Sequence, residues 1–177
     1  MSAYSEVYLA DVVENQGKLF DFVAQSYPDK DTTDFINAYM TSKTRKTIDE
    51  AKAYVNTMSA KELWQYFSDT EGYTLKSGKS LEGFLPDWIG EFYAYYQWFY
   101  DVPSAELIKK IPIDFLMKAY YGLHDLELDL AVKKVGKVWT LPHAEDVGYS
   151  VATYFKSSPK DLLANIFLRY FATKMRW

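Results

Sequence analysis

The sequence predicts an all-α fold, a compact multi-helix domain around a central aromatic-rich helix at about residues 86–101 of the 177-residue chain. Three observations lead to this prediction. Apolar residues recur at spacings of three and four along most of the chain, which is the period of an amphipathic helix. Residues typical of helix caps precede several of these segments. Nine of the seventeen residues in FLPDWIGEFYAYYQWFY (84–100) are aromatic, as expected of a buried central helix.

The N-terminal region begins with a long amphipathic helix. Its helical spacing is established from Leu9, and Pro28 ends it because proline cannot continue a helix. Asp31 and Asp34 then supply cap residues for a second helix. We therefore expect two consecutive helices in the first forty residues.

Two capping-box patterns predict the next two helices. Thr47 with Glu50 indicates the start of a third helix, and Ser59 with Glu62 indicates the start of a fourth. Gly72 is placed to end the fourth helix, because glycine readily takes the left-handed conformation that follows a helix. The first seventy residues are thus predicted to be helical apart from short connections.

Residues 72–83, GYTLKSGKSLEG, hold three of the eight glycines. This composition predicts a loop or a short β-hairpin near residues 73–82. We expect residues 1–177 to form a single helical domain, and the 72–83 segment is the place where a seam between two subdomains would fall.

The central helix is expected to begin near Pro86, since proline suits the first helical turn. Most of its surface is aromatic or aliphatic, so it needs neighbours on most sides. A narrow stripe of polar or very small residues remains, and it faces water or admits a neighbouring helix at Gly90 and Ala94. The stripe comprises Asp87, Gly90, Glu91, Ala94, Gln97 and Asp101.

Further helices are predicted after the central one. Proline starts a short helix at Pro103 and another at Pro112. Residues 125–135 form the next, which Gly136 is expected to stop. Residues 142–155 are ambiguous between helix and strand. A C-terminal helix is expected to begin at Ser158, where a cap residue precedes a first-turn proline.

Composition excludes several classes of function. The chain has no cysteine, which rules out disulfides, thiolate metal sites and cysteine nucleophiles and is compatible with a reducing cytoplasm. The N-terminus lacks the pattern of a secretory signal, and Asp87 and Glu91 interrupt the aromatic segment, so no membrane association is expected. The net charge of −4 argues against nucleic-acid binding. We predict a cytoplasmic protein.

No motif of useful specificity for catalysis or cofactor binding occurs. Gly78, Lys79 and Ser80 match the end of a phosphate-binding loop, but the spacing to Gly72 is wrong. Acidic residues beside His124 are explained by the dipole of a helix that starts there. His143 could act as a general base only with a distant partner. The basic run at 43–46 is interpreted as a solvated surface. We expect no metal and no cofactor.

The segments DWIGEFYAYYQWFYDVPSAELIKKIP and FLMKAYYGLHDLELDLAVKKVG resemble a group of small bacterial proteins of unassigned function, over most of residues 7–136. That group is associated with mobile-element neighbourhoods that also contain toxin–antitoxin genes. The resemblance implies no activity, cofactor or catalytic residue. It implies an accessory or neutralising role as an option.

The functional prediction is a non-enzymatic protein-interaction module, an antitoxin-like or regulatory protein with a protein partner that the sequence does not identify. Tyrosine and tryptophan are favoured in binding hot spots. The predicted contact residues are Trp88, Tyr93, Tyr95 and Trp98, with Asp87 and Glu91 as a polar rim. The alternative is an enzyme or a small-molecule-binding protein, whose aromatic-walled pocket holds His124 or His143 with carboxylates.

Overall fold

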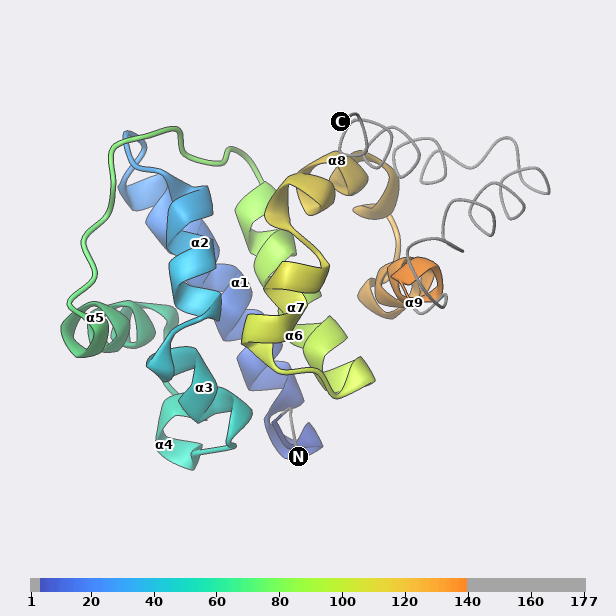
Figure 1. The fold of residues 1–177 in the computed structure, drawn as a ribbon, viewed down its shortest axis with the longest axis horizontal. Helices are drawn as coiled ribbons and strands as arrows, with labels where there is room; N and C mark the ends of the chain where they lie inside the picture. Colours follow the sequence, from blue (N-terminus) through green and yellow to red (C-terminus); the bar gives the residue numbers. More distant parts are fainter. Residues whose placement is uncertain (1–3, 140–177) are drawn as a thin grey trace. The chain divides into compact units, whose positions relative to one another are not determined.

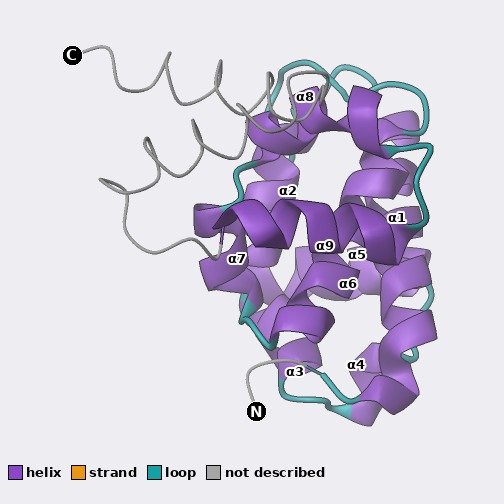
Figure 2. Ribbon diagram, turned by 90° about the vertical axis from the view of Figure 1, so that its right-hand side faces the viewer, coloured by secondary structure: helices purple, strands orange, loops and turns teal. Residues whose placement is uncertain are grey.

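The computed structural model describes residues 4–139 and confirms the all-α prediction (Figures 1 and 2). Described residues are helical or in loops, and none forms a strand. The elements in chain order are η1 (Glu6–Tyr8), α1 (Leu9–Ser26), α2 (Thr32–Met40), α3 (Lys43–Asp49), α4 (Ala53–Asn56), α5 (Ala60–Glu71), α6 (Leu85–Tyr100), α7 (Ser104–Lys110), α8 (Ile113–Leu123) and α9 (Leu128–Trp139).

Contacts divide the chain into two compact units, Met1–Ile113 and Asp114–Trp177. The division therefore falls at the start of α8, away from the 72–83 segment where we had placed a seam. That segment instead lies inside the first unit, where it links α5 to α6 in an extended path (Figure 1, green).

Cap chemistry explains the helices that the sequence predicted well. Ser59 and Glu62 form both hydrogen bonds of the capping box at the start of α5, and Gly72 ends this helix in the left-handed conformation at φ 58°. Pro86 lies in the first turn of α6. The central aromatic helix thus forms where the sequence placed it, with its last helical residue at Tyr100.

The third helix differs from the prediction because another residue caps it. Ser42 accepts a hydrogen bond from the backbone N–H of Arg45, so α3 begins at Lys43, four residues before Thr47. The hydroxyl of Thr47 bonds the carbonyl of Thr44 instead. Ala51 then takes a positive φ of 56°, which ends this stretch of helix and separates α3 from the short α4.

Of the two forms predicted for residues 73–82, a loop or a short β-hairpin, the structure has the loop. The segment pairs with the chain before α2 through an isolated antiparallel bridge between Lys30 and Ser77. Its backbone bonds run from Asp31 N–H to the carbonyl of Lys76 and from Gly78 N–H to the carbonyl of Asp29. The segment therefore pairs with residues 29–31, which are distant in sequence, and not with itself as in a hairpin.

The first unit is organised by the contact of α1 with α6, the most extensive between any two helices described. The helices run antiparallel, since Gln16 bonds the carbonyl of Gly90 while Tyr4 bonds that of Ala94. At the crossing, a Cβ on Gly90 would lie 2.6 Å from the carbonyl oxygen of Gln16 and 2.7 Å from the Cα of Gly17. The small-residue stripe on the central helix therefore admits a neighbouring helix, as the sequence allowed.

In the second unit, α8 and α9 bury apolar residues at helical spacing. These are Phe115, Leu116, Ala119, Leu123, Ala131, Val132 and Val135. Gly136 does not stop α9, which continues to Trp139, and the helix begins at Leu128, three residues after the predicted start. The ambiguous 142–155 segment, His143 and the helix predicted from Ser158 lie outside the described residues.

Across residues 4–139, the helices are too short or too polar to span a lipid bilayer.

Candidate functional site

Four of the six predicted contact residues lie along one face of α6. Asp87, Glu91, Tyr95 and Trp98 follow spacings of four, four and three, which bring side chains to the same side of a helix. Each of the four is half-buried. These four side chains form one partly accessible line along α6.

The other two predicted residues are buried: Trp88 borders this face, and Tyr93, two residues after Glu91, lies on the opposite side of the helix. Trp88 is 8% exposed and Tyr93 is not exposed at all. The hydroxyl of Tyr93 donates a hydrogen bond of 2.6 Å to the backbone carbonyl of Ile111. Both rings are thus part of the core of the protein.

Phe84 extends the same face at its N-terminal end. Its side chain is 81% exposed, and it stands one helical turn before Asp87 with a nearly helical backbone. The predicted helix began at about residue 86, so Phe84 was not among the predicted contact residues. The signal available was its position just before Pro86, outside the helix that would bury it. We call Phe84, Asp87, Glu91, Tyr95 and Trp98 the α6 stripe.

Two carboxylates, Asp87 and Glu91, occupy the middle of the α6 stripe. Neither Asp87 nor Glu91 has a hydrogen-bond or ion-pair partner among the described residues. Partial burial raises the pKa of Asp87, with repulsion from Asp21 adding to the shift and Lys18 opposing it. Burial also raises the pKa of Glu91, followed by repulsion from Asp87 and Glu14.

The surroundings on α1 explain why this charge is not neutralised. Glu14 and Asp21 add two more carboxylates beside the α6 stripe, and Lys18 is the cation that acts on Asp87. Lys18 is itself paired with Glu14. A local excess of negative charge therefore accompanies the middle of the α6 stripe.

Aromatic rings gather at the C-terminal end of the α6 stripe. The rings of Tyr95 and Trp98 have centroids 5.6 Å apart at 64°, and Tyr95 stacks on Phe99 at 6.3 Å. Phe99 is 40% exposed. Such rings can contact apolar side chains on their surfaces and attract cations to their faces.

A second polar group is fully buried on another side of α6. Arg45 has no exposed surface, and its guanidinium donates hydrogen bonds of 2.8 Å to Gln16, 2.7 Å to Asp49 and 2.7 Å to Gln97. The other oxygen of Asp49 accepts bonds from the backbone N–H and hydroxyl of Ser104. We call these five residues the Arg45 hub, and they join α1, α3, α6 and α7.

The Arg45 hub corrects the interpretation of residues 43–46 as a solvated basic run. Lys43 and Lys46 are exposed, but the arginine between them is buried. The guanidinium needs acceptors at that depth, and three side chains supply them. The available signal was weak: Gln16 falls on the apolar face of its helix, and Gln97 lies in the small-residue stripe.

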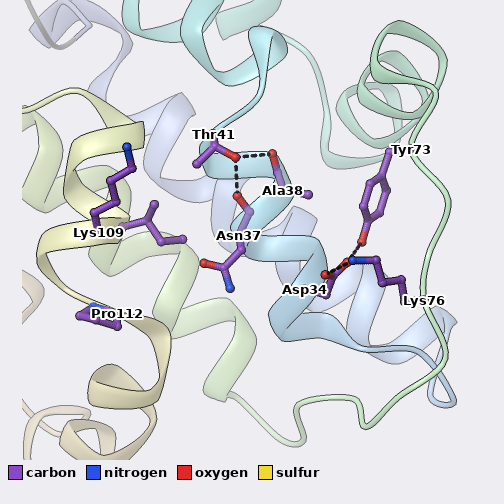
Figure 3. A pocket seen from close by; sticks show the side chains of 9 residues that line it. Asp34, Asn37, Ala38, Thr41, Tyr73, Lys76, Lys109 and Pro112 are labelled. Carbon is purple, nitrogen blue, oxygen red and sulfur yellow. Dashed lines mark hydrogen bonds and ion pairs between the residues drawn. The ribbon is translucent and has the colours of Figure 1, made fainter. Parts of the chain in front are cut away.

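An open groove of about 560 Å³ lies within the first unit, between α2, α7 and the extended segment after α5 (Figure 3). Its lining residues are Asp34, Asn37, Ala38, Thr41, Tyr73, Lys76, Ile108, Lys109 and Pro112. On one wall, Asp34 accepts bonds of 2.9 Å from the Tyr73 hydroxyl and 2.6 Å from the Lys76 amine.

The charges in this wall stabilise one another. The hydrogen bond from Lys76 lowers the pKa of Asp34, and the same contact raises the pKa of Lys76. Burial and the bond to Asp34 raise the pKa of Tyr73. Asp34 therefore stays ionised and Tyr73 stays neutral at pH 7, an arrangement that can bind polar groups but provides no general base near neutrality.

Among residues 4–139, no histidine lies in the α6 stripe or in the lining of the groove. His124 lies in the second unit, where its ring stacks on Tyr120 with centroids 4.6 Å apart and its Nε2 is 3.2 Å from Asp125. Within residues 4–139, no group of three or more His, Asp or Glu side chains is arranged to hold a metal ion.

The residues that match the end of a phosphate-binding loop have a structural role. The hydroxyl of Ser80 is buried and bonds Thr32 at 2.9 Å and the carbonyl of Ala24 at 2.8 Å. Gly78 packs so closely on Asp31 that a Cβ would lie 2.6 Å from the Cβ of Asp31. These contacts attach the extended segment to α1 and α2.

Comparison with known proteins gives no match to a family model, to a curated protein or to a solved structure.

Proposed function

We propose that this chain is a non-enzymatic protein-interaction module that binds a partner protein along the α6 stripe. The antitoxin-like or regulatory role implied by the resemblance is part of this proposal. So is a cytoplasmic location, which the absence of cysteine fits.

The observation that carries the proposal is the composition and exposure of the α6 stripe. It combines partly exposed aromatic rings with carboxylates that have no partner in the described part of the chain. Interface hot spots are enriched in tryptophan and tyrosine, surrounded by polar groups that exclude water. Unpaired, partly buried carboxylates also cost folding free energy, which is a reason to expect a role outside the fold.

The double substitution Tyr95→Ser/Trp98→Ser tests this proposal. Affinity capture from the native host, followed by mass spectrometry, is expected to recover a stoichiometric protein with the parent chain and to lose it with the variant. Circular dichroism and urea unfolding establish that the variant is folded. Unfolding of the double variant instead would assign both rings to the core and contradict the proposal.

A matched control is available in a second pair of aromatic side chains. Tyr54, 56% exposed, packs edge-on against Tyr66 with ring centroids 6.4 Å apart. Tyr54→Ser/Tyr66→Ser removes a similar aromatic area from a different surface. The captured protein should remain bound to this control, and its loss from both variants would mean that the α6 stripe has no specific role.

The groove favours a second candidate function, the binding of a small molecule. Its volume of about 560 Å³ suits a small ligand. The wall of Tyr73, Asp34 and Lys76 supplies an aromatic ring and charged groups. Native mass spectrometry of the purified protein tests this candidate: a bound metabolite that is retained by the parent and lost from Asp34→Asn would support it.

A further inference from the structure

We infer that the partner of the α6 stripe is a helix with basic residues at its centre and apolar residues at both ends. This inference rests on the proposed function and adds the chemistry of the partner. It follows from the order of side chains along the α6 stripe, from their charge and from their exposure.

The order of the side chains defines what can bind. Phe84 occupies one end of the α6 stripe, Tyr95 and Trp98 occupy the other, and Asp87 and Glu91 lie between them. At 1.5 Å per residue, the fourteen steps from Phe84 to Trp98 span about 21 Å. A helix of about fifteen residues covers this length when it lies along α6.

The negative charge of Asp87 and Glu91, at the centre of the α6 stripe, favours a cationic partner group. Asp87 and Glu91 are one turn apart, so their side chains are about 5–6 Å from each other on the same face. Both experience repulsion from other carboxylates, and Lys18 is already paired with Glu14. Arginine or lysine residues one turn apart on a partner helix would face both carboxylates and relieve this repulsion.

The α6 stripe differs from a simple group of acids because it also presents aromatic rings. The side chain of Phe84 is large and apolar, yet it is 81% exposed. At the other end of the stripe, the rings of Tyr95 and Trp98 are half-buried. Apolar side chains of a partner can cover these rings, and an arginine can also lie over a ring face. The described carboxylates form no group suited to a metal ion, so a basic protein segment is the cation that fits.

Three synthetic peptides test the inference. Each has fifteen residues of an alanine-based helix with leucine at both ends, and the two central positions, four apart, carry arginine, glutamine or glutamate. Fluorescence anisotropy with the full chain is expected to show the arginine peptide binding about tenfold tighter than the glutamine peptide, the glutamate peptide weakest, and the preference falling with added salt.

Two protein variants test whether the preference for the arginine peptide depends on Asp87 and Glu91. Asp87→Asn/Glu91→Gln is expected to bind the arginine and glutamine peptides equally. The control Asp29→Asn/Asp69→Asn, which neutralises two exposed carboxylates elsewhere, should keep the tenfold difference. A preference that survives the first change, or disappears with the control, would overturn the inference.

The outcomes also separate this inference from the proposed function. No measurable binding of the arginine peptide, or tighter binding of the glutamine or glutamate peptide, overturns the basic partner. The proposed function still stands in that case if the captured protein is lost with Tyr95→Ser/Trp98→Ser. Failure of the capture experiment, in contrast, removes the proposed function whatever the peptides do.

Discussion

The Arg45 hub and the α6 stripe lie on two sides of α6, and their carboxylates differ in whether they are paired. In the hub, Asp49 is paired with Arg45 and bonded by Ser104. In the stripe, Asp87 and Glu91 are half-buried and have no partner among the described residues. A fully satisfied buried network is expected of a structural element, whereas the unpaired, half-buried carboxylates of the stripe are the basis of the proposed binding site.

The largest expected effect comes from removing the cation of the Arg45 hub. Arg45→Met leaves Asp49 buried without its counter-charge, and the free energy of unfolding should fall by about 3–5 kcal/mol in urea denaturation. Arg45→Met/Asp49→Asn should be more stable than Arg45→Met alone, because it also removes the unpaired charge. A loss below about 1 kcal/mol for Arg45→Met would contradict a structural role for the Arg45 hub.

The next effect concerns the crossing of α1 and α6, on which both regions depend. Gly90→Ala places a methyl group 2.6 Å from the backbone oxygen of Gln16, so we expect a loss of about 1–3 kcal/mol in unfolding free energy. The matched change Gly17→Ala should cost less, since its two nearest contacts are the side chains of Asp87 and Glu91, which can rotate away. The reverse order would mean that the helices are not in closest contact at Gly90.

Substituting the acids of the α6 stripe is expected to change the unfolding free energy less than substituting Arg45. The change should be an increase in stability, where the hub substitution lowers it. Because the folded-state pKa values of Asp87 and Glu91 are raised, their ionisation destabilises the fold as pH rises from about 4 through these pKa values. Asp87→Asn/Glu91→Gln should therefore equal or exceed the parent in stability at pH 7.

The pH dependence provides the measurement for that prediction. Unfolding is followed in urea from pH 3.5 to 7.5 for the parent and the double variant, and the difference between them is expected to grow in favour of the variant as pH rises. Asp34, Glu62 and Asp129, whose pKa values are lowered, are present in both proteins, so their contributions cancel in the difference. A difference that grows in favour of the parent would show that these carboxylates are stabilising.

The smallest effect is that of the exposed cation on α1. Lys18→Gln removes a solvent-exposed ion pair with Glu14, so the unfolding free energy should change by no more than about 0.5 kcal/mol. The pKa of Asp87 should rise further, because Lys18 opposes its shift. Carboxyl-carbon NMR titration measures this change, and a lower pKa in the variant would exclude Lys18 as a neighbour of Asp87.

The fold was predictable where local chemistry determines it. Ser59 and Glu62 cap α5 as expected, and Pro86 starts the central helix, since both effects act within one turn. The start of α3 was mispredicted because Thr47 and Glu50 match the capping-box pattern, whereas the residue that caps the helix in the structure is Ser42. The extended path near Ser77 depends on a contact with Lys30, far away in the sequence.

The candidate site was predictable in part for a similar reason. Helical periodicity places Asp87, Glu91, Tyr95 and Trp98 on one face, but it does not determine how deeply Trp88 or Tyr93 is buried, because neighbouring elements decide that. Tyr93, for example, bonds Ile111 beyond the end of its own helix. The burial of Arg45 depends on three glutamine and aspartate side chains from other turns or helices, and no local pattern brings them together.

The antiparallel contact of α1 with α6 has a consequence for how the chain reaches its native state. Tyr4 bonds Ala94 and Gln16 bonds Gly90, contacts between residues 90 and 74 positions apart. Contacts of such separation slow folding compared with a bundle of neighbouring helices, even at high helix content. During synthesis, α6 cannot cover the apolar face of α1 until Tyr100 has left the ribosome, and until then the nascent chain exposes a surface prone to aggregation.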